Sequence, residues 1–257
     1  MNVTILPEFA IAFALVFARI GTMMMLIPGL GERTTPARIR LGLAVLVTLL
    51  TLPIVRAGMP KSMESLAALA QLLISELLIG FTFGLVSRFM MSSLQTAGVL
   101  IAQQMGLSFT MMLDPTHGDQ GQSAVISSFL SLLGVSLILA LNLHHVALMG
   151  IVDSYRTFSP GELPPAGDAA QLAISVAKTS FGVGVQIAAP FLVFGLVFNV
   201  GLGVLSRMMP QLQVFFLAMP ATILVGTVVL ILVLSLMMEG FTGHVAATFR
   251  ELFPGAR

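Results

Sequence analysis

The sequence contains no cysteine and no tryptophan, and it has a single tyrosine, Tyr155. The absence of cysteine excludes disulfide bonds, thiolate catalysis and cysteine-ligated metal sites. Tryptophan and tyrosine usually form belts at the two lipid interfaces of a membrane protein. Their scarcity is either chance within one lineage or a sign that the chain meets less lipid headgroup than its hydropathy would suggest.

Charged residues are also scarce. They make up 9% of the chain, whereas ordinary soluble domains carry roughly 25%. So few charges cannot cover the surface of a soluble fold, and lipid or other protein subunits must therefore cover most of the exterior. The net charge of +1 gives no excess of positive charge for a nucleic-acid-binding stripe.

Apolar residues make up 57% of the sequence and gather in runs separated by short polar breaks. A helix of about twenty residues crosses a hydrocarbon core of about 30 Å. The pattern therefore predicts an all-α, membrane-class protein with about six spans. The stretch Phe89–Leu113 is ambiguous, because several glutamines interrupt it, and it would add one further span. The runs are Phe9–Leu30, Leu41–Val55, Leu66–Val86, Ala124–Val152, Ala169–Leu205 and Leu212–Met238.

A single domain is predicted over residues 1–257, because the sequence has no linker long enough to separate domains and no low-complexity tract. The first run is predicted to be a retained helix and not a cleaved signal peptide, since Glu8 comes early and no Lys or Arg precedes it. The Lys and Arg residues of the predicted loops divide almost equally between the two sides of the membrane. The excess of positive charge that normally marks the cytoplasmic side is therefore missing, and the orientation of the chain in the membrane cannot be assigned from it. Either the span count is wrong or these helices are not ordinary spans.

Ionisable residues inside the apolar runs are the candidates for catalysis or ion coupling, because they are costly there and persist mainly for function. They are Arg19, Glu76, His144 and His145. The two histidines are adjacent, so on a helix they point about 100° apart and cannot hold one metal ion together. No HExxH motif, helical carboxylate pair or phosphate-binding loop is present. We interpret these groups as structural, forming interhelical hydrogen bonds or pairing with partner subunits, and we predict no catalytic residue, metal or cofactor.

Gly80 and Gly84 form a small-xxx-small pair, which lets two helix backbones approach closely. Such pairs are common in helical membrane proteins. This one predicts a helix-packing contact and says nothing about mechanism.

Methionine is abundant, with seventeen residues, many of them in tandem. Its flexible side chain fills irregular gaps and suits surfaces that adapt to varied partners. Core filling explains most of these residues. Met111 and Met112 differ, because they lie in an apolar segment that leaves the helical pattern after Gly106 and runs into the polar loop Thr116–Gln122. An apolar loop of this kind between helices is suited to forming a compliant seal.

Three stretches carry a resemblance to a known family. The central one is Gly98-x-x-Ile101-x-x-Gln104-Met-Gly-Leu-Ser-Phe109, followed by Asp114-Pro115. The others are Glu32-Arg33-x-x-Pro36-x-x-x-Arg40-Leu-Gly-Leu-Ala44 and Arg207-x-x-Pro210-Gln-Leu-x-Val-Phe215, which ends at Pro220. With Asn142 and the histidine pair in mid-chain, the sequence resembles the FliR family of flagellar type III export-gate proteins over essentially its full length. Leu143, Gln213 and Ala218 depart from the family pattern and put only local packing in doubt.

The resemblance implies a chain built of helical hairpins, with a FliP-like part followed by a FliQ-like part. Members assemble with FliP and FliQ into a helical export gate, FlhB wraps around it, and FlhA-like export proteins are further partners. The gate sits in the flagellar basal body at the bacterial inner membrane, largely above the membrane plane. This placement would account for the even charge division and the missing aromatic belt.

The resemblance also implies that the loop after the central motif plugs the pore in the closed state, in agreement with the seal interpretation. The predicted plug residues are Gly106, Leu107, Phe109, Met111, Met112, Leu113, Asp114 and Pro115. Contacts with partner subunits or lipid headgroups are predicted for Arg33, Arg38, Arg40 and Arg207.

The implied function is that of a structural, pore-forming and non-enzymatic subunit that passes unfolded export substrates. The alternatives are the equivalent subunit of an injectisome, a small-solute secondary transporter and, third, a membrane enzyme. The motif between Arg207 and Phe215 favours the flagellar branch. A secondary transporter should show inverted repeats with paired broken helices, and we find no convincing repeat. The sparse ionisable residues disfavour an enzyme.

Overall fold

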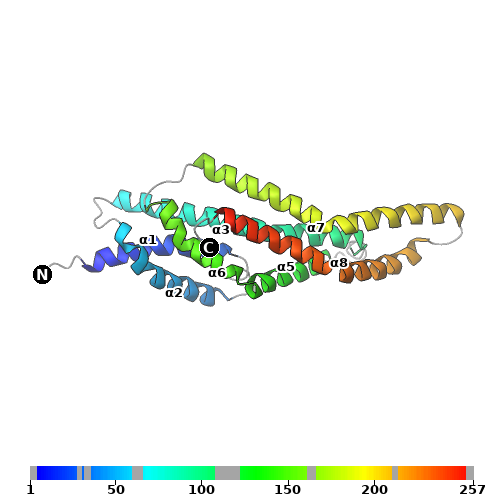
Figure 1. Cartoon of the computed structure of the whole chain (residues 1–257), viewed down its shortest axis with the longest axis horizontal. Helices are drawn as coiled ribbons and strands as arrows, with labels where there is room; N and C mark the ends of the chain where they lie inside the picture. The colour runs from blue at the N-terminus through cyan, green and yellow to red at the C-terminus, as the bar shows by residue number, and fades with distance from the viewer. Residues whose placement is uncertain are drawn as a thin grey trace. The chain divides into compact units, whose positions relative to one another are not determined.

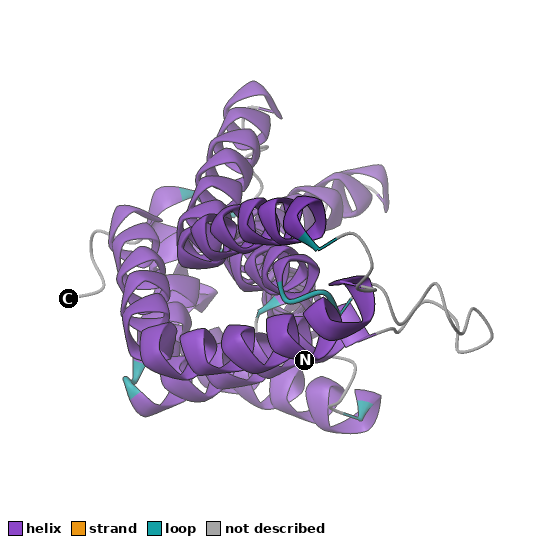
Figure 2. Ribbon diagram, turned by 90° about the vertical axis from the view of Figure 1, so that its right-hand side faces the viewer, coloured by secondary structure: helices purple, strands orange, loops and turns teal. Residues whose placement is uncertain are grey.

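The computed structural model describes residues 5–27, 31, 36–59, 66–107, 122–160, 166–209 and 214–252. In these ranges every regular element is a helix and none is a strand, as Figures 1 and 2 show. The prediction of an all-α protein is confirmed. The elements are α1 (Ile5–Leu26), α2 (Ala37–Val55), the short 3₁₀ turn η1 (Arg56–Gly58), α3 (Leu66–Gln104), α5 (Gln122–Ala140), α6 (Leu143–Thr157), α7 (Ala166–Met208) and α8 (Val214–Leu252).

Five of these helices are long and apolar enough to cross a membrane, and α5 with α6 adds a sixth if that bent pair forms one broken span. The expected number of about six spans therefore holds only when the pair is counted as one. Three helices are much longer than a bilayer needs. With 39, 43 and 39 residues, α3, α7 and α8 would each extend about 60 Å, twice the thickness of the hydrocarbon core.

The helix that contains the predicted apolar run Leu66–Val86 does not end at Val86. The apolar run from Leu66 and the ambiguous stretch from Phe89 form one continuous helix, α3. Ser87 does not interrupt it, because its hydroxyl donates to the carbonyl of Phe83 at 3.1 Å within the same helix. Arg88 is exposed on the helix surface. The additional span is therefore excluded.

The predicted run Ala124–Val152 is also not one helix. It breaks at Leu141 and Asn142, and α6 begins at Leu143. Asn142 has φ of 58°, and among the described non-glycine residues it alone has a positive φ. Asparagine tolerates this left-handed conformation better than most residues, because its short polar side chain can hydrogen-bond locally. The residue therefore permits a turn inside an otherwise apolar run.

The described chain divides into two compact units. One comprises Met1–Met90, Leu139–Lys178 and Ala246–Arg257, and the other Met91–Ile138 and Thr179–Val245. In the first unit α1 packs against α2, and α2 also meets α6. Helices α3, α7 and α8 each begin in one unit and end in the other. A single domain over residues 1–257 remains a prediction.

In the second unit, α3 and α5 form an antiparallel hairpin. Gly98 of α3 lies against the backbone of Ser127 on α5, and Gly134, further along α5, lies against Leu94, further back along α3. Contacts that lie further along α5 thus involve residues further back along α3, so the two helices run in opposite directions. The hydroxyl of Ser127 also donates to the carbonyl of Gln95 at 3.3 Å. The end of α3 and the start of α5 therefore lie at the same end of this hairpin.

We expect Asn142→Gly to leave the stability of the protein nearly unchanged and Asn142→Val to lower it. A β-branched residue in the left-handed region costs roughly 1–2 kcal/mol, and glycine adopts this conformation freely. Thermal unfolding of the detergent-solubilised protein measures both variants. Equal stability of the valine and glycine variants would show that Asn142 does not require this backbone conformation.

Candidate functional site

The most polar place inside the first unit is a buried ion pair between α1 and α3. Arg19 and Glu76 are both fully buried. The Nε of Arg19 donates to Oε2 of Glu76 at 2.5 Å, and its second terminal nitrogen, Nη2, donates to Oε1 at 3.1 Å. This two-point contact matches the planar guanidinium fork to the carboxylate. The sequence-based interpretation of these two residues as interhelical hydrogen-bonding groups is confirmed.

The same guanidinium also binds the end of α6. Its Nη1 donates to the carbonyl oxygens of Ser154 at 3.1 Å and Phe158 at 3.2 Å, and to the Ser154 hydroxyl at 3.4 Å. The Ser154 carbonyl also accepts the amide of Phe158 at 2.9 Å, and the C-terminal end of a helix carries partial negative charge, so a cation is favourable there. The guanidinium carbon also lies 3.9 Å from the centroid of the Tyr155 ring. Arg19 thereby joins α1, α3 and α6.

This network provides acceptors for a buried charge. Removing an unpaired ion from water costs several kcal/mol, and here carboxylate and carbonyl oxygens replace the lost water. Of the other intrahelical candidates, His144 and His145 place their ring centroids 4.1 Å apart. In the described part of the chain no group of three or more His, Cys, Asp or Glu residues could hold a metal ion.

The glycine pair of α3 lies against α1. A methyl group on Gly80 would overlap the Thr22 hydroxyl and the Arg19 carbonyl, and one on Gly84 would lie 2.7 Å from Cβ of Leu26. The two helix backbones approach closely at these positions. The approach brings the α1 backbone at Arg19 close to Gly80, one helical turn after Glu76.

The end of α3 is closed by a paired set of backbone hydrogen bonds. Gly106 has φ of 72°, its amide donates to the carbonyl of Gln103 at 3.1 Å, and the amide of Leu107 donates to the carbonyl of Ala102 at 3.0 Å. This is the Schellman arrangement, in which a left-handed glycine ends a helix and satisfies its last carbonyls. Gly106 therefore fixes where α3 stops and where the following loop begins.

Residues 10–248 match the family described as bacterial export proteins, family 1. The flagellar biosynthetic protein FliR of Caulobacter vibrioides is 43% identical over 232 residues, covering 88% of this chain and 92% of that protein. The FliR proteins of Pectobacterium carotovorum and Escherichia coli are 33% and 31% identical, covering 92% and 91% of this chain and 88% and 87% of those proteins. The chain belongs to the FliR family.

As a FliR family member, the chain is a component of the flagellar export apparatus. Its partners are therefore other membrane-associated proteins of that apparatus, and its apolar helices make it a membrane-embedded protein. The relatives are named for flagellar biosynthesis and export and not for a reaction. The resemblance drawn from the three motifs is confirmed.

Of the predicted FliR plug residues, the structure describes Gly106 and Leu107 at the end of α3. The remaining six lie outside the described residues and are Phe109, Met111, Met112, Leu113, Asp114 and Pro115. Their role in the pore therefore stays a prediction.

The predicted partner-contact arginines occupy different environments. Arg38 is exposed at the start of α2, and Arg207 is exposed in the last turn of α7. Arg40 is half-buried, and its Nη1 donates to the carbonyl of Gly31 at 3.4 Å. Arg33 lies outside the described residues. The structure brings none of the described three together with another of them in a hydrogen bond or ion pair.

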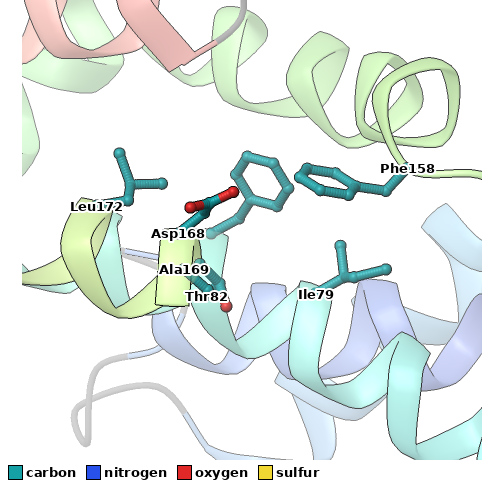
Figure 3. A pocket seen from close by; sticks show the side chains of 7 residues that line it. Ile79, Thr82, Phe158, Asp168, Ala169 and Leu172 are labelled. Carbon is teal, nitrogen blue, oxygen red and sulfur yellow. The ribbon is translucent and has the colours of Figure 1, made fainter. Parts of the chain in front are cut away.

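A pocket with a volume of about 270 Å³ lies beside the Arg19 network in the first unit (Figure 3). The Phe83 and Phe158 rings meet edge to face in it, with centroids 6.0 Å apart. Among the described residues that line it, Asp168 in the first turn of α7 is the only charged one. The pocket shares Phe158 with the network and is otherwise mainly apolar. The lining residues are Ile79, Thr82, Phe83, Phe158, Asp168, Ala169 and Leu172.

Sequence reasoning missed the α6 half of the Arg19 network. Ser154 and Phe158 contribute mainly backbone carbonyls, which every residue carries, so no side-chain pattern could identify them. The one available signal was Tyr155, the single tyrosine in the chain, because aromatic rings attract guanidinium groups. The sequence offered no means of pairing it with a residue in the first run.

We expect Glu76→Leu to destabilise the protein by about 3–5 kcal/mol, because it leaves the Arg19 charge buried without its carboxylate. The double variant Arg19→Met with Glu76→Leu should be less destabilised than Glu76→Leu alone, since the uncompensated charge is gone. Thermal unfolding of the solubilised protein measures both.

The control for this pair is Arg156→Gln, which breaks the exposed ion pair with Asp153 on α6 and should cost less than about 1 kcal/mol. If the double variant were less stable than Glu76→Leu, the contacts of Arg19 with α6 would matter more than the ion pair with Glu76.

Proposed function

We propose that this chain is a structural, pore-forming subunit of the flagellar type III protein-export gate. It assembles with FliP-like and FliQ-like subunits, contacts FlhB-like and FlhA-like export proteins, and passes unfolded export substrates across the bacterial inner membrane at the flagellar basal body. It acts without catalysing a reaction and without a cofactor. The chain thus lines the pore itself and is more than a general component of the export apparatus.

The observation that carries the proposal is the position of the central motif on the α3–α5 hairpin. The motif ends α3 at Gly106, and the helix that follows returns antiparallel along α3. In the sequence, the apolar segment with Phe109, Met111 and Met112 lies between these two packed helices. A loop at such a tip can enter a pore while its base stays fixed in the helical structure.

The chemistry of the loop suits a seal. A hydrophobic constriction stops ions by dewetting, without a charged gate. Methionine and phenylalanine pack adaptively and can close again around a passing chain. An export channel needs this adaptability because its substrates differ in sequence.

The exposed surface of the second unit supports assembly with other subunits. Large apolar side chains recur at helical spacing along single faces of α7 and α8, where they are exposed. Contiguous apolar patches of this kind mark surfaces that partners or lipid must cover. The exposed residues are Val193, Leu196, Val197, Val200 and Val204 on α7, and Leu224, Val228, Ile231, Leu232 and Leu236 on α8.

The lengths of the helices support a position that is partly outside the bilayer. Helices α3, α7 and α8 exceed the span of the hydrocarbon core about twofold. Protein partners must then cover the apolar surface that lipid tails do not reach. This arrangement accounts for the near absence of Trp and Tyr and for the even division of basic residues.

We expect deletion of Phe109–Gly118 to leave the export complex largely assembled and to let small ions leak through it. The loop would contribute little to helix–helix contacts and would supply the apolar volume that blocks the pore. The measurements are the yield of purified complex and the salt sensitivity of cells that express it. The competing interpretation is that the loop only supports neighbouring helices. It predicts loss of the complex without a leak, and that result would overturn the plug.

We expect the triple substitution Arg33→Gln, Arg38→Gln and Arg40→Gln to weaken assembly or motility only in part, with a larger effect at low salt. Charges at the rim of an interface usually contribute about 0–1 kcal/mol and are screened by ions. Arg88→Gln, an exposed position in mid-α3, is the control. Complete loss of assembly in the triple variant, with no effect of the single changes, would instead indicate a buried network.

A further inference from the structure

The pocket beside the Arg19 network has walls from three segments of the first unit (Figure 3). Ile79 and Phe83 of α3 are buried, with 1% and 7% of their surface exposed. Phe158 follows the end of α6, and two nitrogens of the Arg19 guanidinium each donate to its carbonyl at 3.2 Å. The two phenyl rings are therefore held in place, one by packing in the core and the other through its backbone.

The polar side chains among the described lining residues can accept hydrogen bonds but have no proton to donate. Asp168 is exposed at the start of α7, and Figure 3 shows its carboxylate extending from the helix toward the side on which the Phe158 ring lies. The hydroxyl of Thr82 already donates to the carbonyl of Leu78 at 2.8 Å, so only its lone pairs remain. A group that satisfies both side chains must therefore be a donor, and a cation suits the carboxylate best.

The negative charge of Asp168 is not neutralised within the part of the chain that the structure describes. The ion pairs there join Arg19 to Glu76 and Arg156 to Asp153. The N-terminal end of α7 carries a partial positive charge of about half an elementary charge, which leaves the wall net negative. An acidic residue in the first turn also stabilises a helix, but that role does not explain the aromatic rings beside it.

The neighbouring Arg19 network shows which cation suits a wall of this kind. Its guanidinium binds the carboxylate of Glu76 and lies 3.9 Å from the centroid of the Tyr155 ring. The pocket offers the same two features, a carboxylate and aromatic rings, and none of its described lining residues is a cation. A guanidinium group stacks on aromatic faces and pairs with a carboxylate through its planar fork, whereas an ammonium group is a strongly hydrated point charge.

The size of the pocket suits a single side chain. Its volume of about 270 Å³ lies below the roughly 300–1,000 Å³ of sites for drug-sized ligands. We propose that the pocket receives an arginine side chain from a partner protein of the export apparatus, with the guanidinium group at Asp168 and against the rings of Phe83 and Phe158. The apolar remainder of the wall covers the stem of that side chain. The proposal requires assembly with such proteins and does not depend on the pore or the plug.

A single introduced cysteine can report on the pocket, because the chain has none of its own. Ala169→Cys places a thiol on the wall. In the full chain purified alone, this thiol should react several-fold faster with cationic 2-aminoethyl methanethiosulfonate than with the anionic sulfonatoethyl reagent, because Asp168 attracts the cation. Adding Asp168→Asn should remove the difference. In the assembled export complex the reaction should be several-fold slower than in the chain alone. Ala170→Cys, at an exposed neighbouring position that does not line the pocket, is the control and should slow less.

A second measurement is the salt concentration at which partner proteins dissociate from the chain. Asp168→Asn should shift it to a lower value, and Asp168→Arg should shift it further, because it places two like charges together. The matched control is Glu251→Gln, which removes an exposed carboxylate in the last turn of α8 in the same unit and should leave the value unchanged. If Asp168→Asn also lowers the thermal stability of the chain alone and Asp168→Arg has no further effect on dissociation, Asp168 serves only the start of α7 and the proposal is overturned.

Other occupants of the pocket would give different results. Equal reaction rates of Ala169→Cys in the chain alone and in the complex would show that no partner enters the pocket. Slower reaction in the complex that Asp168→Asn leaves unchanged would indicate an apolar side chain. Protection of the thiol in phosphatidylethanolamine vesicles without partner proteins, but not in detergent, would indicate a lipid amine. Protection in detergent without partners would indicate another segment of this chain. Each of these four results contradicts a partner arginine.

Discussion

The buried charge of Arg19 is the constraint on which the first unit depends. In an apolar interior a guanidinium group is tolerated only when acceptors surround it, and these acceptors come from three helices. Glu76 supplies the carboxylate from α3, and Ser154 and Phe158 supply carbonyl oxygens at the end of α6. Because α1, α3 and α6 must meet at this one point, their packing is far more narrowly defined than apolar contacts alone would require.

Close backbone contacts also fix how α3 packs against its neighbouring helices. At Gly80 the helix approaches α1, and within the second unit Gly98 meets the backbone of α5 while Gly184 of α7 lies 2.8 Å from the Ser93 carbonyl, measured from an added Cβ. Where lipid tails are as apolar as the side chains, close van der Waals packing replaces the hydrophobic effect as the force that holds helices together. Gly80, Gly98 and Gly184 thus serve the close helix packing that a membrane-embedded protein requires.

Different parts of the chain have different roles. The ion pair of Arg19 and Glu76 joins two helices of the first unit, and the apolar segment after α3 carries the proposed seal. Methionine serves both purposes, since Met105 packs in the core while Met111 and Met112 belong to the loop.

The sequence by itself determined the helical class, the membrane character and the family, because these depend on apolar runs and on short motifs whose residues are neighbours in the chain. It also identified Arg19 and Glu76 as costly groups that needed partners. Only the tertiary structure decided which partners they found, since Ser154 is 135 residues from Arg19 and offers a backbone carbonyl. The tertiary structure also decided that α3 continues past Arg88 and that Met105 packs against Gly226. Contacts of this kind depend on where helices meet in space, and periodicity along one helix does not contain that information.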